Sequence, residues 1–442
     1  MLKASIASIG MKLIGAFALM LLNIVFAALI SANDFGLFSF AMSTIAVLGT
    51  LACYGYGQVI MRDGSQVREL AKDTLFREIL STGRAAVLLV SFFVTLVLFA
   101  GYALNVPVPV FSHGPAFLGV VAACTPLYGF MLLHREGLRA DGQLGMALIG
   151  FNLLRPIVPL VVFGTMLLFV KPDIMTAMIA WLLGLLVIFV IDSARLHPTA
   201  WAILPIAKPG VASMRKASVL CLSEVSNIVL LQAPILVAGI VVDLGAAALL
   251  YAAHRLAMLA LFGIDGMRIA LAPQIARSFT RSSREEQASV LNRASVLWAV
   301  SGLIFAAPIG ILAPQLLGLF GHEYVEATTA LLIITIGRLF QALVGPTGAV
   351  MQYGRMEHLR AAFTLAAAAV QIAATVCFGK IFGIVGIAWA MTLSIIALEI
   401  VSLLAIRRRT GIWLGVGFVI QKPSSIPAAF KQLLDLLRKR RP

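Results

Sequence analysis

Long apolar stretches separated by short polar loops run along the whole chain. Stretches of about 20 apolar residues are long enough to cross a bilayer as α-helices, and the chain is 61% hydrophobic. Because a soluble domain is roughly 45–50% apolar, the pattern predicts an all-α polytopic membrane protein. We expect twelve transmembrane helices, at residues 13–32, 36–61, 83–104, 116–134, 144–170, 174–194, 217–241, 245–272, 291–312, 327–350, 361–379 and 384–406.

Lys and Arg are distributed unevenly between the loops on the two sides of these spans. If the N-terminus is cytoplasmic, 28 of the 34 basic residues fall on the cytoplasmic side, and only Lys171 and Lys380 fall on the other. Since loops rich in Lys and Arg stay in the cytoplasm, both termini are predicted to be cytoplasmic. The first apolar stretch is too long for the core of a signal peptide and is interpreted as an uncleaved helix.

Short sequence matches recur at a nearly constant offset. Asp34-Phe35-Gly36 matches Asp243-Leu244-Gly245 at an offset of 209 residues, and Ile179-Ala180-Trp181 matches Ile387-Ala388-Trp389 at 208. Parallel repeats of this kind are related by a pseudo-twofold axis along the membrane normal, and a transporter keeps its cargo site in the cleft between them. The predicted organisation is a cytoplasmic N-terminus (1–12), an N-lobe of six helices (13–194), a cytoplasmic linker (195–216), a C-lobe of six helices (217–406) and a basic cytoplasmic tail (407–442).

The tail has two expected features. Residues 424–442 place apolar side chains on one helical face and end in a basic cluster, which predicts an amphipathic helix on the anionic leaflet; a solvated basic end is the alternative. Glu399, near the end of the last span, is expected to pair with Arg407 or its neighbours.

Four arginines lie inside predicted spans: Arg155, Arg255, Arg268 and Arg338. A charge at bilayer depth is costly unless it faces protein, water or a partner charge. The guanidinium fork also matches a phosphate in a bidentate manner. Together these residues predict a positive interior that attracts a negatively charged cargo.

Structural roles for two of these arginines remain open. Arg255 could instead form an ion pair with Glu224 on the preceding span. Arg268 follows Asp265 by three residues, a spacing that places both on one helix face, so a local neutralised pair is an alternative to cargo binding.

Glu224 stands in Ser223-Glu224-Val225-Ser226-Asn227, the most polar stretch of any central span. A carboxylate shielded from water can bind or release a proton near neutral pH. Glu224 and Asp265 are therefore the candidates for coupling transport to H⁺ or Na⁺. The alternative for Glu224 is a structural role as the partner of an arginine. Asn23 and Asn152 are candidates to line the cargo cavity, with interhelical hydrogen bonds as the alternative.

No motif indicates an enzyme or a bound cofactor. The four cysteines lie far apart inside apolar stretches and are interpreted as buried apolar residues rather than as a metal site or disulfide framework. No GxxxxGK[ST] loop is present, and the outer loops are too short for acceptor chemistry. Nucleic acid is not expected as a partner, because the positive charge carries information on membrane orientation.

Several hairpin and loop strings occur in order along nearly the whole chain: NDFGLFSFAMSTIAVLGTLACYGYG, HREGLRADGQ, APQLLGLFGHEYVEAT, GRMEHLRA and FGIVGIAWAMT. They resemble the Wzx-like polysaccharide transporter branch of the multidrug/oligosaccharidyl-lipid/polysaccharide (MOP) flippase superfamily. The resemblance implies twelve helices in two lobes, alternating access, and export of polyprenyl-pyrophosphate-linked oligosaccharide across the bacterial cytoplasmic membrane. Membrane lipids and polysaccharide polymerase machinery are the further partners that it implies.

Two other functions are weighed against this flippase. A multidrug cation or ion antiporter of the same superfamily would need acidic side chains in its cavity, and the first six spans offer no carboxylate in mid-membrane, since Asp192 lies at the cytoplasmic end. A membrane polysaccharide polymerase would need a larger outer loop.

Overall fold

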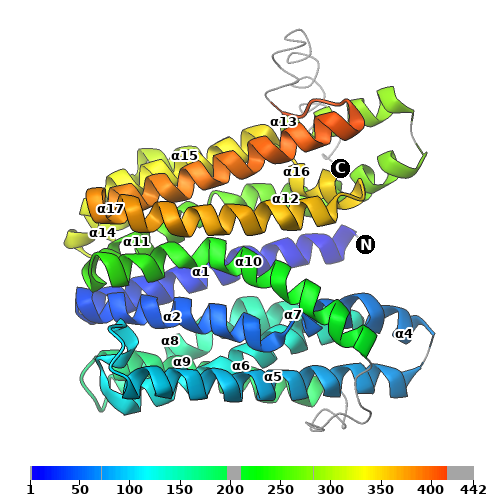
Figure 1. The fold of residues 1–442 in the computed structure, drawn as a ribbon. Coiled ribbons are helices and arrows are strands. Elements are labelled where there is room, and N and C mark those ends of the chain that lie inside the picture. Colours follow the sequence, from blue (N-terminus) through cyan, green and yellow to red (C-terminus); the bar gives the residue numbers. More distant parts are fainter. Residues whose placement is uncertain (1, 71, 197–210, 282, 416–442) are drawn as a thin grey trace. The chain divides into compact units, whose positions relative to one another are not determined.

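The computed structural model describes residues 2–70, 72–196, 211–281 and 283–415, and over these residues all regular structure is helical (Figure 1). Ten of the described helices are long and apolar enough to cross a bilayer, and the bent pair Leu244–Met258 and Leu261–Arg268 supplies an eleventh span. One of the ten, α17 (Glu357–Thr410), is interrupted at Gly383, whose φ of 56° is not helical. Because α17 therefore contains two spans, the predicted membrane fold with about twelve helices is confirmed.

Contacts between helices divide the chain into two units. Unit 1 comprises Met1–Tyr251 and Leu319–Gly321, and unit 2 comprises Ala252–Gly318 and His322–Pro442. The boundary falls inside α11 (Leu244–Met258), so α10 belongs to unit 1. Most of the predicted linker and the predicted amphipathic tail helix lie outside the described residues, and the predicted division into two symmetric lobes stays a prediction.

Unit 1 is built around α2. This helix packs against α5, α6 and α10, while α6 also packs against α9, and α9 against α8 (Figure 1). Aromatic rings fill its interior: the Phe26 ring lies 5.1 Å from that of Phe38 and 4.6 Å from that of Phe163. Its helices are α1 (Leu2–Leu29), α2 (Ala32–Cys53), α3 (Tyr56–Val59), the π-helix η1 (Ile60–Gly64), α4 (Ser65–Glu69), α5 (Asp73–Ala103), η2 (Pro109–Phe111), α6 (Gly114–Ala140), α7 (Leu144–Leu148), the π-helix η3 (Ile149–Leu154), α8 (Arg155–Met166), α9 (Ile174–Arg195), α10 (Val211–Val241) and the first half of α11.

Unit 2 is built around α13, α15 and α17. The helix α13 packs against α12 and α15, and α17 packs against α15 and α16. Ser283 and Glu286 form a reciprocal capping box that begins α13, which satisfies backbone N–H groups in its first turn. Besides the second half of α11, the helices are α12 (Leu261–Arg281), α13 (Arg284–Ile311), α14 (Ala313–Gly318), η5 (His322–Ala327), α15 (Thr328–Val344), α16 (Thr347–Tyr353) and α17.

The predicted span 36–61 is interrupted in the structure. Tyr54 and Gly55 both have positive φ values, 48° and 73°, which ends α2 before α3 begins. Glycine adopts this conformation readily, and at Gly55 a side chain would also collide with the backbone of α10 at Ala217 and Cys221. The predicted span runs through CYGYG without a break, so the interruption was missed.

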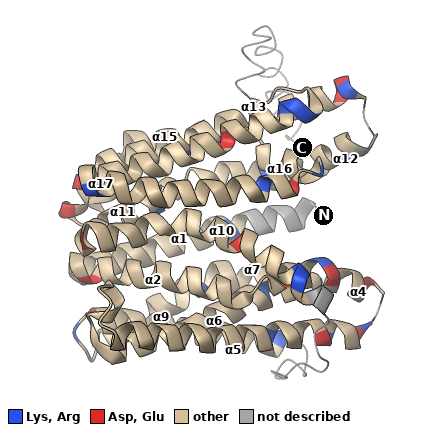
Figure 2. Ribbon diagram, in the orientation of Figure 1, with Lys and Arg blue, Asp and Glu red and all other residues tan. Residues whose placement is uncertain are grey.

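Basic residues gather at one end of each unit (Figure 2). In unit 1 they lie at α4 and the start of α5, and in unit 2 at the start of α13 and the end of α17. At these ends the helices extend beyond the predicted apolar spans. The helix α5 begins at Asp73, whereas the predicted span begins at residue 83, and α12 extends to Arg281. The predicted cytoplasmic location of these ends stays a prediction.

The two matched hairpins are closed by side-chain caps. Ser31 accepts a 3.1 Å hydrogen bond from the backbone N–H of Asp34, and Asp243 accepts one of 2.6 Å from that of Ala246. In unit 1 the glycine of the first hairpin, Gly36, lies directly against the carbonyl of Leu244, where a Cβ would collide. Gly36 therefore sets how closely the start of α11 approaches α2.

We expect Gly36→Ala to destabilise unit 1 by about 1–3 kcal/mol, the usual cost of overpacking, because the obstructing atom is backbone. Gly119→Ala is the matched control: Gly119 also lies within a helix, but no atom occupies the space of its missing Cβ. The measurement is denaturant-induced unfolding of the purified protein in detergent. Equal unfolding midpoints for the two variants would contradict the inferred close contact.

Candidate functional site

Arg338 is buried in the interior of unit 2. It lies on α15, its residue is 6% exposed, and its Nη2 donates to the sulfur of Met258 at 3.7 Å. Among the residues that the structure describes, no carboxylate lies within 4 Å of this guanidinium and its Nε has no partner. Glu399 lies within electrostatic range of this guanidinium but not in contact with it. A buried cation without a carboxylate in direct contact is costly, so Arg338 is a strong candidate for a functional role.

Two side chains of α11 lie near this guanidinium. His254 is 3% exposed and lies within electrostatic range of both Arg338 and Arg255. Arg255 itself is half-buried. The structure thus brings Arg338 and its neighbours on α11 together from two predicted spans. The alternative pairing of Arg255 with Glu224 joins residues of the two units and stays a prediction.

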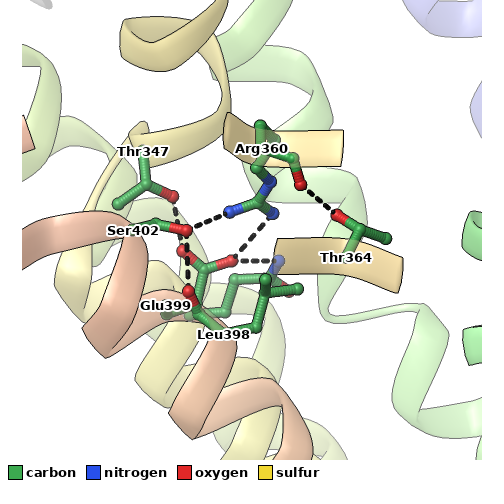
Figure 3. Close-up of polar contacts among 7 residues, drawn as sticks. Thr347, Arg360, Thr364, Leu398, Glu399 and Ser402 are labelled. Atoms are coloured by element: carbon green, nitrogen blue, oxygen red, sulfur yellow. Dashed lines mark hydrogen bonds and ion pairs between the residues drawn. The ribbon is translucent and has the colours of Figure 1, made fainter. Parts of the chain in front are cut away.

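A buried carboxylate on α17 is the centre of a polar network that also includes side chains of α15 and α16 (Figure 3). Glu399 is 1% exposed and accepts hydrogen bonds from Thr347 and from Gln341 Nε2, the latter at 3.2 Å. Arg360 completes the network through a 3.3 Å ion pair to Glu399 and a 2.8 Å hydrogen bond to Ser402.

The expected pairing of Glu399 with Arg407 or its neighbours is wrong. Arg360 lies at the start of α17, and the interruption at Gly383 allows the two ends of α17 to lie side by side. Arg407 instead lies over the Trp413 ring at 4.0 Å. The network therefore joins both ends of α17 to α15 and α16.

Arg155 lies in unit 1 beside an aromatic ring. Its guanidinium carbon is 4.5 Å from the centre of the Phe151 ring, and that of Arg135 is 4.3 Å from the same ring. Asn152 and Phe151 belong to the π-helix η3, whose backbone passes so close to α1 that Gly15 has no room for a side chain against Asn152. Since π-helices occur frequently at functional sites, η3 supports a functional role for this region.

Glu224, on α10, contacts α3. Gln58 Nε2 donates to its carboxylate at 2.7 Å, and Arg135 and Glu136 of α6 lie within electrostatic range. Glu136 is itself held by Arg135 at 2.8 Å and by Arg139 at 2.7 Å. The coupling candidate thus lies in a charged cluster of unit 1, and sequence reasoning missed Gln58 and Glu136. The CYGYG interruption, which presents Gln58 beside α10, is the signal that could have found them.

The remaining candidates, Asn23, Arg268 and Asp265, form local polar contacts within their own helices. Asn23 is buried, and its Nδ2 donates to the carbonyl of Leu19 on its own helix at 2.7 Å. Arg268 forms the expected i, i+3 ion pair with Asp265 at 3.0 Å, and both side chains are exposed, by 59% and 39%. Cargo or ion binding by these residues stays a prediction.

Arg84, in the first turn of the predicted span 83–104, lies well inside a longer helix. Because α5 begins eleven residues before it, Arg84 is 2% exposed within the helix and donates from Nε to His134 Nε2 at 3.1 Å. The His134 ring is flanked by the rings of Phe130 and Phe189. Asp192, on α9, is likewise 2% exposed, so unit 1 contains buried ionisable groups that its hydropathy does not reveal.

Comparisons with known proteins extend this picture. No protein-family model matches the chain, and no curated protein matches it. Among solved structures, an inward-facing multidrug resistance MATE family transporter of the MOP superfamily is 16% identical with a TM-score of 0.70, covering 92% of this chain and 98% of that one. An outward-facing form of a MATE transporter is 18% identical with a TM-score of 0.63, covering 92% and 96%.

A third solved structure is a MOP superfamily transporter from Pyrococcus furiosus, for which a reversed polarity of the binding pocket is reported to suggest a different function. It is 17% identical with a TM-score of 0.61, covering 91% of this chain and 95% of that one. The chain therefore has the fold of MATE transporters and is a multi-pass membrane protein. Its resemblance to the polysaccharide branch of the superfamily stays a prediction.

Proposed function

We propose that this protein is a flippase for an anionic lipid-linked oligosaccharide, with a polyprenyl pyrophosphate as the charged group. The observation that carries the proposal is Arg338, a buried guanidinium without a carboxylate in ion-pair range among the described residues. A pyrophosphate would supply the missing counter-charge in the bidentate geometry that arginine favours. Arg255 extends the positive region that this cargo would meet.

Two features of the structural neighbours support this proposal. MATE transporters of this fold occur in inward- and outward-facing forms, which supports alternating access, in which the polar group crosses the protein while the polyprenyl chain stays in lipid. A MOP transporter reported to have reversed pocket polarity supports the view that this fold serves cargos of different charge. The proposed location is the bacterial inner membrane with both termini cytoplasmic, where a polysaccharide polymerase would use the product.

The direct test is flipping by the purified full chain in liposomes. A fluorescent polyprenyl-pyrophosphate oligosaccharide is placed in the inner leaflet, and a membrane-impermeant quencher reports its arrival outside. We expect quenching faster than in protein-free liposomes, with no acceleration for a zwitterionic lipid that carries the same fluorophore. Failure to accelerate the anionic substrate would contradict the proposed function.

Multidrug cation export is the second candidate. The neighbours named as multidrug transporters favour it, and so does the buried carboxylate of Asp192, since acidic groups suit a cationic cargo. The same liposomes loaded with a cationic dye distinguish the two functions. Dye movement driven by a pH or Na⁺ gradient, without movement of the lipid-linked oligosaccharide, would establish the second candidate.

We expect Glu224→Gln to leave the protein folded but to remove the response of transport to a pH or Na⁺ gradient. Glutamine keeps the size of the side chain and a hydrogen-bond partner for Gln58, but it cannot gain or lose a proton or carry the charge that attracts Na⁺. The measurement is the ratio of flipping rates with and without each gradient. Glu285→Gln, an exposed acid on α13, is the control, and an unchanged ratio in Glu224→Gln would remove Glu224 from coupling.

A further inference from the structure

An open pocket of about 630 Å³ lies at the end of unit 2 where α12, α13, α16 and α17 meet. Three arginines line it, namely Arg284 from the first turn of α13 and Arg408 and Arg409 from the last turn of α17. Gln287 and Thr410 add further polar groups, and Phe279 and Met356 form an apolar part of the wall. None of these residues belongs to the candidate site in the interior of the unit.

The backbone at the end of α17 explains the position of Arg284. Gly411 terminates the helix in the left-handed conformation, with φ of 70°, and a Cβ at this position would collide with Nη2 of Arg284. The guanidinium therefore lies directly on the glycine, at the C-terminal end of a helix, where cations are favoured. Glycine at this position both ends α17 and admits Arg284 to the pocket.

The positive charges of the three pocket arginines are not neutralised by ion pairs with acidic side chains of the described chain. Within the described chain, no carboxylate lies within 4 Å of Arg284, Arg408 or Arg409. Glu286, two residues after Arg284, is engaged in the capping box with Ser283. Arg409 is oriented by a 3.0 Å hydrogen bond to the carbonyl of Arg355. Three arginines thus line a common space, and the contacts of Arg284 and Arg409 fix where their guanidinium groups lie.

The chain's own tail is a poor occupant for this pocket. Residues 416–442 contain six Lys and Arg against one acid, Asp435, and like charges repel. A phosphate fits better, because arginine binds its oxygens in bidentate fashion, and basic pockets between membrane helices bind anionic lipid head groups. The volume also lies within the range of about 300–1,000 Å³ that is usual for small-ligand pockets.

We propose that this pocket binds the phosphate of an anionic ligand, either a phospholipid head group or a soluble phosphate ester. The three arginines hold the phosphate oxygens, and the Phe279 and Met356 side contacts the apolar part of the ligand. This binding is independent of the proposed flippase function.

The test is lipid binding by the purified full chain, measured by native mass spectrometry with phosphatidylglycerol, with phosphatidylcholine and with inorganic phosphate. We expect phosphatidylglycerol to bind in preference to phosphatidylcholine, and each arginine removed to weaken it roughly fivefold. Arg284→Ala/Arg408→Ala/Arg409→Ala removes all three groups. Arg408→Gln, at an exposed position, gives the single-step measurement if the triple variant does not fold.

The control is Arg293→Ala, which removes an exposed arginine of α13 outside the pocket. If inorganic phosphate competes fully with phosphatidylglycerol, the natural ligand is a soluble phosphate ester; if it does not, the ligand is the lipid. Phosphatidylglycerol binding that falls no further in the pocket variants than in Arg293→Ala would overturn the proposal.

Discussion

Replacement of Arg338 by Met is expected to abolish flipping while leaving the protein as stable as before, or more stable. The substitution removes a buried cation that has no carboxylate within 4 Å among the described residues, and it fills the space with an apolar side chain of similar length. Loss of one member of a buried charge pair costs about 2–5 kcal/mol in binding, so the cargo should bind at least about 30-fold more weakly. The measurements are the liposome flipping rate and the unfolding midpoint of the same preparation.

This pair of readouts separates a cargo-binding role from a structural one. A structural arginine would lower the unfolding midpoint when it is removed, whereas an arginine kept for the cargo would not. Arg338→Lys retains the charge but loses the fork, and it should recover only part of the activity. The control Arg215→Met removes an exposed arginine of α10. Normal flipping by Arg338→Met would remove this residue from the mechanism and, with it, the main support for an anionic cargo.

The second large effect is expected on stability, from Arg360→Ala. This variant leaves Glu399 buried at 1% exposure with Thr347 and Gln341 as its remaining partners. Breaking a buried ion pair costs about 3–5 kcal/mol, and we expect about 3 kcal/mol here, because a quarter of the Arg360 side chain is exposed. The free energy of unfolding in detergent measures the loss.

Two further variants define the cause of that loss. The double variant Arg360→Met/Glu399→Leu removes both charges and should recover most of the stability, since apolar replacement of a buried pair is often neutral. Arg268→Ala breaks the exposed pair with Asp265 and should change stability by less than about 1 kcal/mol. Equal losses in Arg268→Ala and Arg360→Ala would show that burial of Glu399 does not determine the effect.

The apolar pattern predicted the membrane helices well, because a helix that crosses the bilayer must be apolar over the thickness of the hydrocarbon core. The spans at 361–379 and 384–406 flank Gly383, and the structure is non-helical at that residue. Helix ends were predicted less well. The polar first turns of α5 continue the helix beyond the apolar segment, and this is why Arg84, at the edge of the predicted span, is buried in unit 1.

The candidate sites could be predicted only in part, because a sequence gives the positions of charges along the chain and not their partners. The spacing of Asp265 and Arg268 identified a pair within one helix, which the structure contains. Glu399 has its partner Arg360 at a distance of 39 residues along the chain, and the reversal of direction within α17 was needed to find it. The contact of Glu224 with Gln58 likewise depends on the Tyr54–Gly55 interruption.

Because α10 belongs to unit 1, expressing the protein as two separate fragments would divide that unit. A cut between residues 197 and 210 would leave α10 on the C-terminal fragment, although its packing partner α2 lies on the N-terminal one. Neither fragment would hold every helix of unit 1. Co-expressed fragments would therefore restore unit 1 only by associating, with α10 of the C-terminal fragment packed against α2 of the N-terminal one.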